Sequence, residues 1–203
     1  MRILHVSDVH CSETMLKRLL RRVPDSWYDL LAVTGDLECD GGIINILLNI
    51  SRPVFFVPGN MDDVGIVKIA DEAGINIDAR VIEHSGYYLV GIGGLSTMSS
   101  LNTVKRKLKE EDIDGGKLIV LAHHPPRASK VDRVGHGLNA GLRELREFIE
   151  EYQPLLYLHG HIHESPGSEK IGNTLVVNAG PLLRGHYAIV SINPLEARHY
   201  VLD

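Results

Sequence analysis

Five short motifs in this chain place metal-capable side chains directly after short apolar runs. They are Asp8-Val9-His10, Gly35-Asp36, Gly59-Asn60, His123 and Gly160-His161-Ile162-His163. Carboxylates, imidazoles and a carboxamide form a mixed oxygen and nitrogen set, which suits Mn²⁺, Fe, Zn²⁺ or Ni²⁺ rather than Ca²⁺ or Mg²⁺. Seven donor side chains are too many for one such ion with an open position. The set therefore predicts two ions that share a bridging carboxylate.

Short apolar runs that alternate with amphipathic stretches must position these side chains. Residues 3–6, 29–34 and 53–57 are predicted β-strands. Helices are predicted over 12–20, 42–50 and 63–73. This βαβαβα order implies parallel strands, and parallel strands bring their carboxyl ends to one edge of a sheet. Each motif alone could be a turn or a helix cap, but five motifs at five strand ends have no such common explanation.

The second half of the chain predicts a sheet with more antiparallel pairing. The predicted elements are a hairpin over 81–94, strands at 117–122 and 155–159, helices near 101–111 and 139–151, and a β-rich meander from 168 to 201. No linker or repeat interrupts the pattern. We therefore expect one α/β domain over residues 1–203, with two packed sheets and helices outside.

The composition limits the binding partners and the cellular compartment that we expect for this protein. The net charge of −5 gives no reason to expect nucleic acid or an anionic membrane, and the basic cluster at 105–109 is followed at once by acidic residues. No apolar run reaches the roughly 20 residues of a membrane helix. A small-molecule partner and a cytoplasmic location are expected. Cys11 and Cys39 are expected to be small buried residues in a reducing compartment.

The five motifs resemble, in order, the five sequence blocks of the calcineurin-like metallophosphoesterases, from residue 8 to residue 163. The resemblance implies a four-layer α-β-β-α sandwich of two mixed sheets, with a dinuclear metal site at the strand carboxyl ends. His123 is preferred over His124, because the family reads His-x-Pro-Pro at this block. The implied ligands are Asp8, His10, His163 and the bridging Asp36 for one metal, and Asp36, Asn60, His123 and His161 for the other.

The resemblance also implies an activity. It is the metal-dependent hydrolysis of phosphodiesters or activated phosphomonoesters by a hydroxide that bridges two divalent ions, with Mn²⁺ preferred. Asp36, Asn60 and His123 then act through the metal site, and Asn60 and Arg127 are candidates for substrate contact. A nuclease and a non-catalytic interaction module, as in the retromer subunit of this fold, remain alternatives. The missing basic surface argues against the first, and the complete ligand set argues against the second. A homo-oligomer is also possible.

One residue departs from the family pattern at the reaction centre. The family commonly has histidine after the asparagine of the third block, where this chain has Met61. That histidine is thought to help protonate the departing oxygen, which a thioether cannot do. We therefore predict good activity on aryl esters and poor activity on alkyl monoesters. His124 and His136 are candidate substitutes, and Asp62 is left without its usual histidine partner.

Overall fold

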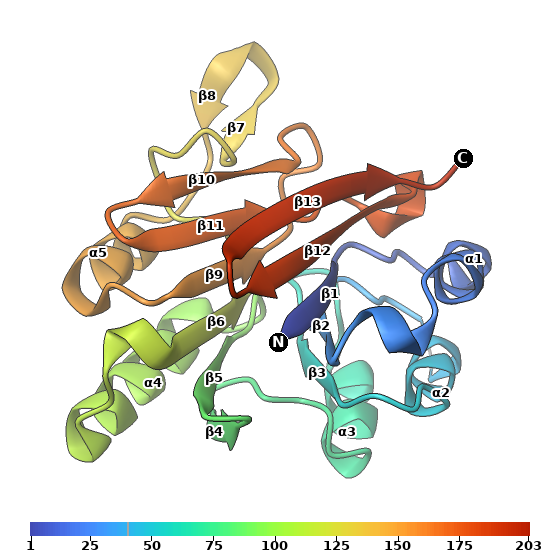
Figure 1. The fold of residues 1–203 in the computed structure, drawn as a ribbon, viewed down its shortest axis with the longest axis horizontal. Helices are drawn as coiled ribbons and strands as arrows, with labels where there is room; N and C mark the ends of the chain where they lie inside the picture. Colours follow the sequence, from blue (N-terminus) through green and yellow to red (C-terminus); the bar gives the residue numbers. More distant parts are fainter. Residues whose placement is uncertain (40) are drawn as a thin grey trace.

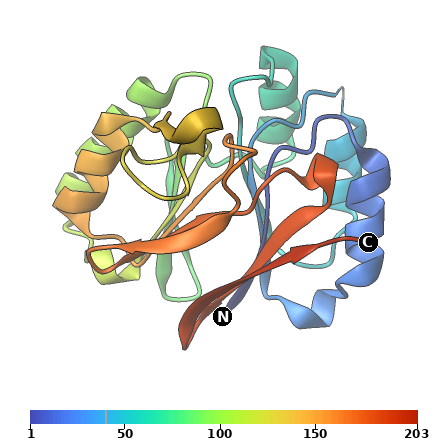
Figure 2. The same cartoon turned by 90° about the horizontal axis from the view of Figure 1, so that it is seen from above.

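The computed structural model of this protein describes residues 1–39 and 41–203, without the side chain of residue 136. Two β-sheets pack against each other, and helices cover the outer face of each (Figures 1 and 2). This arrangement confirms the predicted four-layer α/β sandwich with two mixed sheets.

The first sheet contains the three predicted parallel strands. Its order is β13-β12-β1-β2-β3, and β1, β2 and β3 are parallel. Leu4 of β1 packs among the apolar residues of the covering helices, whereas Ile3 faces the other sheet. Both faces are buried, which explains why these strands are continuous apolar runs. The elements are β1 (Arg2–Val6), β2 (Leu30–Thr34), β3 (Val54–Val57), α1 (Glu13–Arg22), α2 (Gly42–Leu48) and α3 (Val64–Glu72).

The second sheet has the order β10-β11-β9-β6-β5-β4. Its four central strands are parallel, and β4 and β10 are antiparallel strands at its two edges. Helices α4 and α5 cover its outer face through a separate apolar cluster. The elements are β4 (Val81–His84), β5 (Tyr87–Ile92), β6 (Leu118–Ala122), β9 (Leu156–His159), β10 (Gly167–Ile171), β11 (Thr174–Asn178), α4 (Thr97–Glu111) and α5 (Arg143–Tyr152).

The C-terminal strands differ from the predicted meander. β10 and β11 complete the second sheet, but the hairpin of β12 (His186–Ile192) and β13 (Leu195–Val201) joins the first sheet beside β1. Periodicity identifies strands but not their partners, so it could not divide the tail between two sheets.

Several short elements were also outside the prediction. Helix α4 begins at Thr97, four residues before its predicted start, and a small hairpin precedes α5. None of the described helices combines the length and the apolar character that crossing a bilayer requires. The short elements are β7 (Arg133–Val134), β8 (Leu138–Asn139) and the 3-10 turns η1 (Asp25–Trp27), η2 (Gly115–Lys117), η3 (Gly135–Gly137) and η4 (Leu182–Arg184).

Candidate metal centre

The seven predicted ligands all follow the carboxyl ends of parallel strands. Three of these strands belong to the first sheet and two to the second, so the site is built across both sheets. The ligands are Asp8 and His10 after β1, Asp36 after β2, Asn60 after β3, His123 after β6, and His161 and His163 after β9.

Asp8, His10 and His163 form the first group. Their donor atoms lie within 4.8 Å of one another. His163 Nε2 is 3.2 Å from Asp8 Oδ1, and His10 Nε2 is 3.3 Å from His163 Nε2. These are the residues that the sequence assigns to one metal, together with Asp36.

Asp36 and His123 form the second group, and their donor atoms also lie within 4.8 Å of those of Asp8. His123 Nε2 is 2.8 Å from Asn60 Oδ1 and 3.5 Å from Asp36 Oδ2. The ring of His161 lies 5.0 Å from that of His123. The structure therefore brings the second predicted set together around His123.

Hydrogen bonds on the far sides of two imidazoles orient their rings. His123 Nδ1 is 2.8 Å from the Thr34 carbonyl oxygen, and His10 Nδ1 is 2.8 Å from Glu38 Oε1. Both partners accept hydrogen bonds, so each Nδ1 donates a proton, and the tautomer with its only proton on Nδ1 turns a lone pair on Nε2 into the site. The lone pair of His123 then faces the oxygens of Asn60 and Asp36. Acceptors that face one another at such distances fit a bound cation, and the donor set suits a first-row divalent metal.

The two carboxylates of the site have shifted pKa values. Burial alone raises the pKa of Asp8, but the hydrogen bond from His163 and the nearby His123 outweigh it and lower the pKa to about 2. The pKa of Asp36 is raised, mainly by burial. The pKa of His163 is also raised by its hydrogen bond to Asp8. Asp8 thus brings a buried negative charge to the site, which a bound cation would stabilise.

The backbone is strained at four of the predicted ligands. Asp8, His10, Asp36 and His161 have φ values of 53°, 46°, 54° and 67°, in the left-handed region that residues other than glycine seldom adopt. Such conformations cost of the order of 1–3 kcal/mol each and persist where the surrounding structure enforces them. Their concentration at one place supports a functional site.

Two glycines of the motifs allow the strand ends to approach closely. A Cβ atom at Gly59 would collide with the carboxylate of Asp36, and a Cβ at Gly160 would collide with that of Asp8. Only glycine therefore fits before Asn60 and before His161 while the carboxylates keep these positions.

Asp62 is a buried residue that sequence reasoning left without a role. Its carboxylate accepts four backbone N–H groups, those of Asp36, Leu37, Glu38 and Gly59, at 2.7–3.0 Å. It therefore fastens the loop after β2 to the loop after β3. The only signal in the sequence was an acidic residue close behind Gly59-Asn60.

Glu38 is a second residue that the sequence did not identify, and it belongs to a further group of possible ligands with His10 and Asp36. We expect Glu38→Gln to weaken Mn²⁺ binding about 10- to 100-fold, because carboxylates that orient metal-binding histidines have effects of this size. Titration calorimetry measures the change. Glu72→Gln, which alters an exposed carboxylate on α3, is the control. Equal affinity of the two variants would contradict the positioning role.

The cysteine prediction was wrong. Cys11 and Cys39 form a disulfide, and the side chain of Cys11 is exposed. The bond connects the loop after β1 to the loop after β2, next to His10 and Glu38. Their separation of 28 residues gave no pairing signal, because proximity here depends on the parallel pairing of β1 with β2.

The remaining sequence candidates have different surroundings. Burial and the neighbouring imidazoles lower the pKa of His124 to about 3. The ring of His124 lies 4.5 Å from that of His161. Arg127 is exposed, and no hydrogen bond or ion pair in the described residues joins its side chain to a ligand. Arg184 follows Leu183, whose N–H donates to the Asp8 carbonyl oxygen at 3.2 Å, so its backbone lies beside the candidate site. The side chain of His136 lies outside the described residues.

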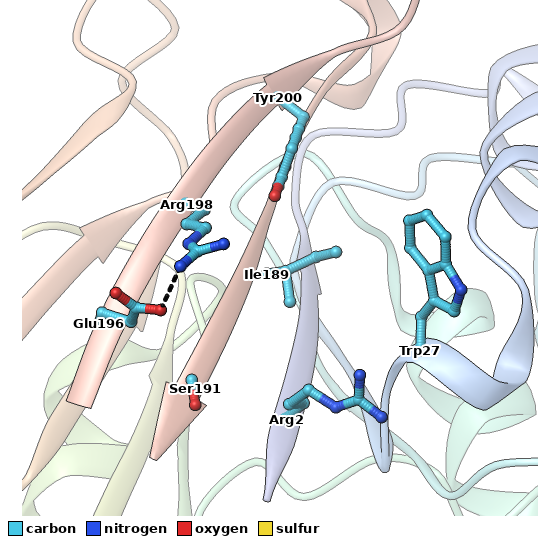
Figure 3. A pocket seen from close by; sticks show the side chains of 7 residues that line it. All are labelled: Arg2, Trp27, Ile189, Ser191, Glu196, Arg198 and Tyr200. Atoms are coloured by element: carbon cyan, nitrogen blue, oxygen red, sulfur yellow. Dashed lines mark ion pairs between the residues drawn. The ribbon is translucent and has the colours of Figure 1, made fainter. Parts of the chain in front are cut away.

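A groove of about 250 Å³ lies away from these side chains. It is lined by residues such as Arg2, Trp27, Ile189 and Arg198, and Figure 3 shows Glu196 paired with Arg198 beside it. None of the predicted metal ligands lines this groove, and Arg2 begins β1, whereas the ligands follow strand ends. We therefore place the candidate chemistry at the strand ends rather than in this groove.

The fold and the donor set together define an α/β sandwich with a candidate two-cation site. A model of the calcineurin-like phosphoesterase family matches residues 1–165. The chain therefore belongs to the calcineurin-like phosphoesterase family, as the five motifs indicated.

Individual relatives agree with this assignment. Uncharacterized protein MJ1162 of Methanocaldococcus jannaschii is 30% identical over 200 residues, which cover 89% of this chain and 88% of that protein. The crystal structure of TT1561 of Thermus thermophilus is similar with a TM-score of 0.79 at 20% identity, over 98% of both chains. A structure described as a novel archaeal phosphodiesterase has a TM-score of 0.65 at 17% identity, over 100% of both chains. At these identities the two structures show a shared fold alone.

Proposed function

We propose that this protein is a metal-dependent phosphoesterase that hydrolyses phosphodiesters or activated phosphomonoesters. The observation that carries the proposal is the meeting of Asp8, Asp36 and His123, whose donor atoms lie within 4.8 Å although they follow three different strands. Family membership supports phosphoester hydrolysis in general. Mn²⁺ is the proposed ion, with Fe, Zn²⁺ or Ni²⁺ as alternatives.

The side chains of the site have separate tasks in this proposal. When bound, two divalent cations supply a nucleophile from water near neutral pH and neutralise the phosphoryl oxygens. Asp36 would serve both ions, because it lies in a group with Asp8 and His123 and in another with His10 and Glu38. Asn60 and His123, whose Oδ1 and Nε2 atoms are 2.8 Å apart, would hold the second ion. Arg184 is a better placed candidate than Arg127 for contact with a phosphoryl oxygen, because the residue before it is hydrogen-bonded to Asp8.

Elemental analysis and two substrates test the proposal. We expect about two metal ions per chain after loading with Mn²⁺, and hydrolysis of bis-p-nitrophenyl phosphate and p-nitrophenyl phosphate. A chelator should remove both the metal and the activity. A protein that binds two ions without hydrolysing either ester would instead be the non-catalytic interaction module. Cleavage of DNA in preference to both esters would favour a nuclease.

Because Met61 stands where the family commonly has histidine, we predict that the rate depends steeply on the pKa of the leaving group. Its side chain cannot protonate a departing oxygen, and general acid help is typically worth about 10²–10⁴-fold. The rate should therefore fall sharply as the pKa of the leaving alcohol rises from p-nitrophenol to simple alcohols. Met61→His should raise the rates of the alkyl esters more than those of the aryl esters. The rescue should be partial, because four backbone N–H groups already occupy the carboxylate of Asp62.

A rate that is nearly independent of leaving-group pKa in the unchanged protein would show that another group donates the proton. His124 is a weak candidate, because a pKa of about 3 leaves its ring neutral near pH 7. We propose that His124 instead supports the ring of His161, which it contacts edge to face.

A cytoplasmic location also belongs to the proposal. The Cys11–Cys39 disulfide is the observation against it, because disulfides are rare in cytosolic proteins other than those of hyperthermophiles. Cell fractionation, with free thiols trapped before lysis, tests both the location and the pairing.

A further inference from the structure

Five exposed apolar side chains follow the carboxyl ends of β3, β5 and β11, on loops or in the first turn of a helix, and these strands run parallel to those that the predicted ligands follow. The described chain has ten large hydrophobic side chains that are exposed, and these five are between 42% and 81% exposed. We call them the apolar rim. They are Met61, Val64, Leu95, Met98 and Leu183.

Two members of the rim are bonded directly to predicted ligands through their backbone. The Met61 N–H donates to Asp36 Oδ1 at 2.9 Å. The Leu183 N–H donates to the Asp8 carbonyl oxygen at 3.2 Å. Their exposed side chains therefore belong to residues that contact Asp36 and Asp8 directly. Val64 follows on the same loop as Met61, at the start of α3.

Two further members follow residues that pack on the second group of ligands. Leu95 follows Gly94, where a Cβ atom would collide with the ring of His123. Met98 follows Thr97, whose Oγ1 is 3.1 Å from Nδ1 of His124. His124 in turn contacts His161. Two rim residues thus bond directly to predicted ligands, and two others directly follow residues that contact His123 or His124.

We propose that the apolar rim binds the ester group of the substrate, and that this group is an alkyl or aryl chain rather than a sugar or a nucleoside. The inference rests on the proposed phosphoesterase function and names its substrate class. Single exposed hydrophobic residues are ordinary, but five that follow the strand ends of one candidate site favour a ligand-binding surface there. The five side chains offer methyl, methylene and thioether groups, which favour an apolar chain and leave the hydroxyls of a sugar without partners.

Phosphodiesters with one constant leaving group test this inference. Methyl, butyl and hexyl p-nitrophenyl phosphate differ only in the group that remains on phosphorus, so the leaving-group effect of Met61 stays constant. We expect kcat/KM to rise about tenfold from methyl to hexyl, because an open rim buries only part of each added methylene. The double variant Leu95→Ser, Met98→Ser should lower this hexyl-to-methyl ratio about threefold.

Trp27→Ser is the matched control, because Trp27 is a similarly exposed hydrophobic residue on the groove of Figure 3, away from the ligands. It should leave the hexyl-to-methyl ratio unchanged. A ratio near one in the unchanged protein, or an equal loss in the control, would overturn the inference. A different result would assign the rim to a lipid surface and would also overturn the inference. In that result the hexyl-to-methyl ratio is near one, and the unchanged protein, but not the double variant, binds phosphatidylcholine vesicles.

Measurements of ligand binding distinguish a failure of this inference from a failure of the proposed function. If no ester is hydrolysed, the proposed function fails, and calorimetry of hexyl and methyl phosphate with the Mn²⁺-loaded protein still tests the rim. Tighter binding of hexyl phosphate, reduced in the double variant but not in Trp27→Ser, supports the rim as an apolar binding surface. Equal affinity for the two phosphates overturns it.

Discussion

Replacing Asp36 by alanine is expected to abolish turnover of bis-p-nitrophenyl phosphate, with kcat at least about 10³-fold lower. Asp36 is buried after β2, and its carboxylate belongs to two of the groups that could hold a metal, one with Asp8 and His123 and one with His10 and Glu38. Its loss removes the donor that both proposed ions share. Elemental analysis should therefore find fewer than two bound Mn²⁺ per chain.

Asp36→Asn separates the chemical effect from a folding defect. The amide keeps the shape of the side chain and an oxygen that can accept the Met61 N–H, which Asp36 accepts at 2.9 Å. Burial raises the pKa of Asp36, so its ionised form destabilises the metal-free protein near neutral pH. Metal-free Asp36→Asn should therefore unfold at the same urea concentration as the unchanged protein or at a higher one.

Asp29→Asn serves as the control for this comparison, because Asp29 is an exposed aspartate just before β2, at the other end of that strand. It should keep both the metal and the turnover. A folded Asp36→Asn protein that hydrolyses the diester at the normal rate would contradict the assignment of Asp36 to the metal site.

Asp62→Ala should cause the largest loss of stability among single substitutions at the site. Four N–H groups, three of them from consecutive residues 36–38, lose their acceptor. A buried donor without a partner costs about 1–3 kcal/mol, so the free energy of unfolding should fall by about 4 kcal/mol or more. Urea unfolding followed by circular dichroism measures this loss. For a chain of this size it corresponds to a fall in Tm of about 10 °C.

The neighbouring Asp63 provides a matched control. It caps α3, where its side chain accepts a single N–H, that of Ile66, at 2.9 Å. Asp63→Ala should cost only about 1 kcal/mol, as is typical for a lost helix cap. Similar losses in the two variants would show that Asp62 does not hold the two loops together. Asp62→Asn, which keeps one acceptor oxygen, should lie between them.

The sequence by itself determined the strands that carry the ligands and the class of chemistry. β1, β2 and β3 are continuous apolar runs, and Asp8, Asp36 and Asn60 follow them directly, so local pattern and parallel order predicted one shared edge. The seven donor side chains, which are carboxylates, imidazoles and one carboxamide, likewise predicted a cation site. Each strand and each motif was identified from residues that are close together in the chain, and the parallel order of the strands then brought the motifs to one edge.

Only the tertiary structure decided how those strand ends are held. The four hydrogen bonds of Asp62, the contact of Glu38 with His10 and the Cys11–Cys39 disulfide each connect separate loops, and the Glu38 and cysteine pairs are 28 residues apart. The return of β12 to the first sheet likewise pairs Arg2 with Ser191. Local periodicity reports which residues are buried but not which distant segment covers them, because strand pairing is selected by the packing of the whole core.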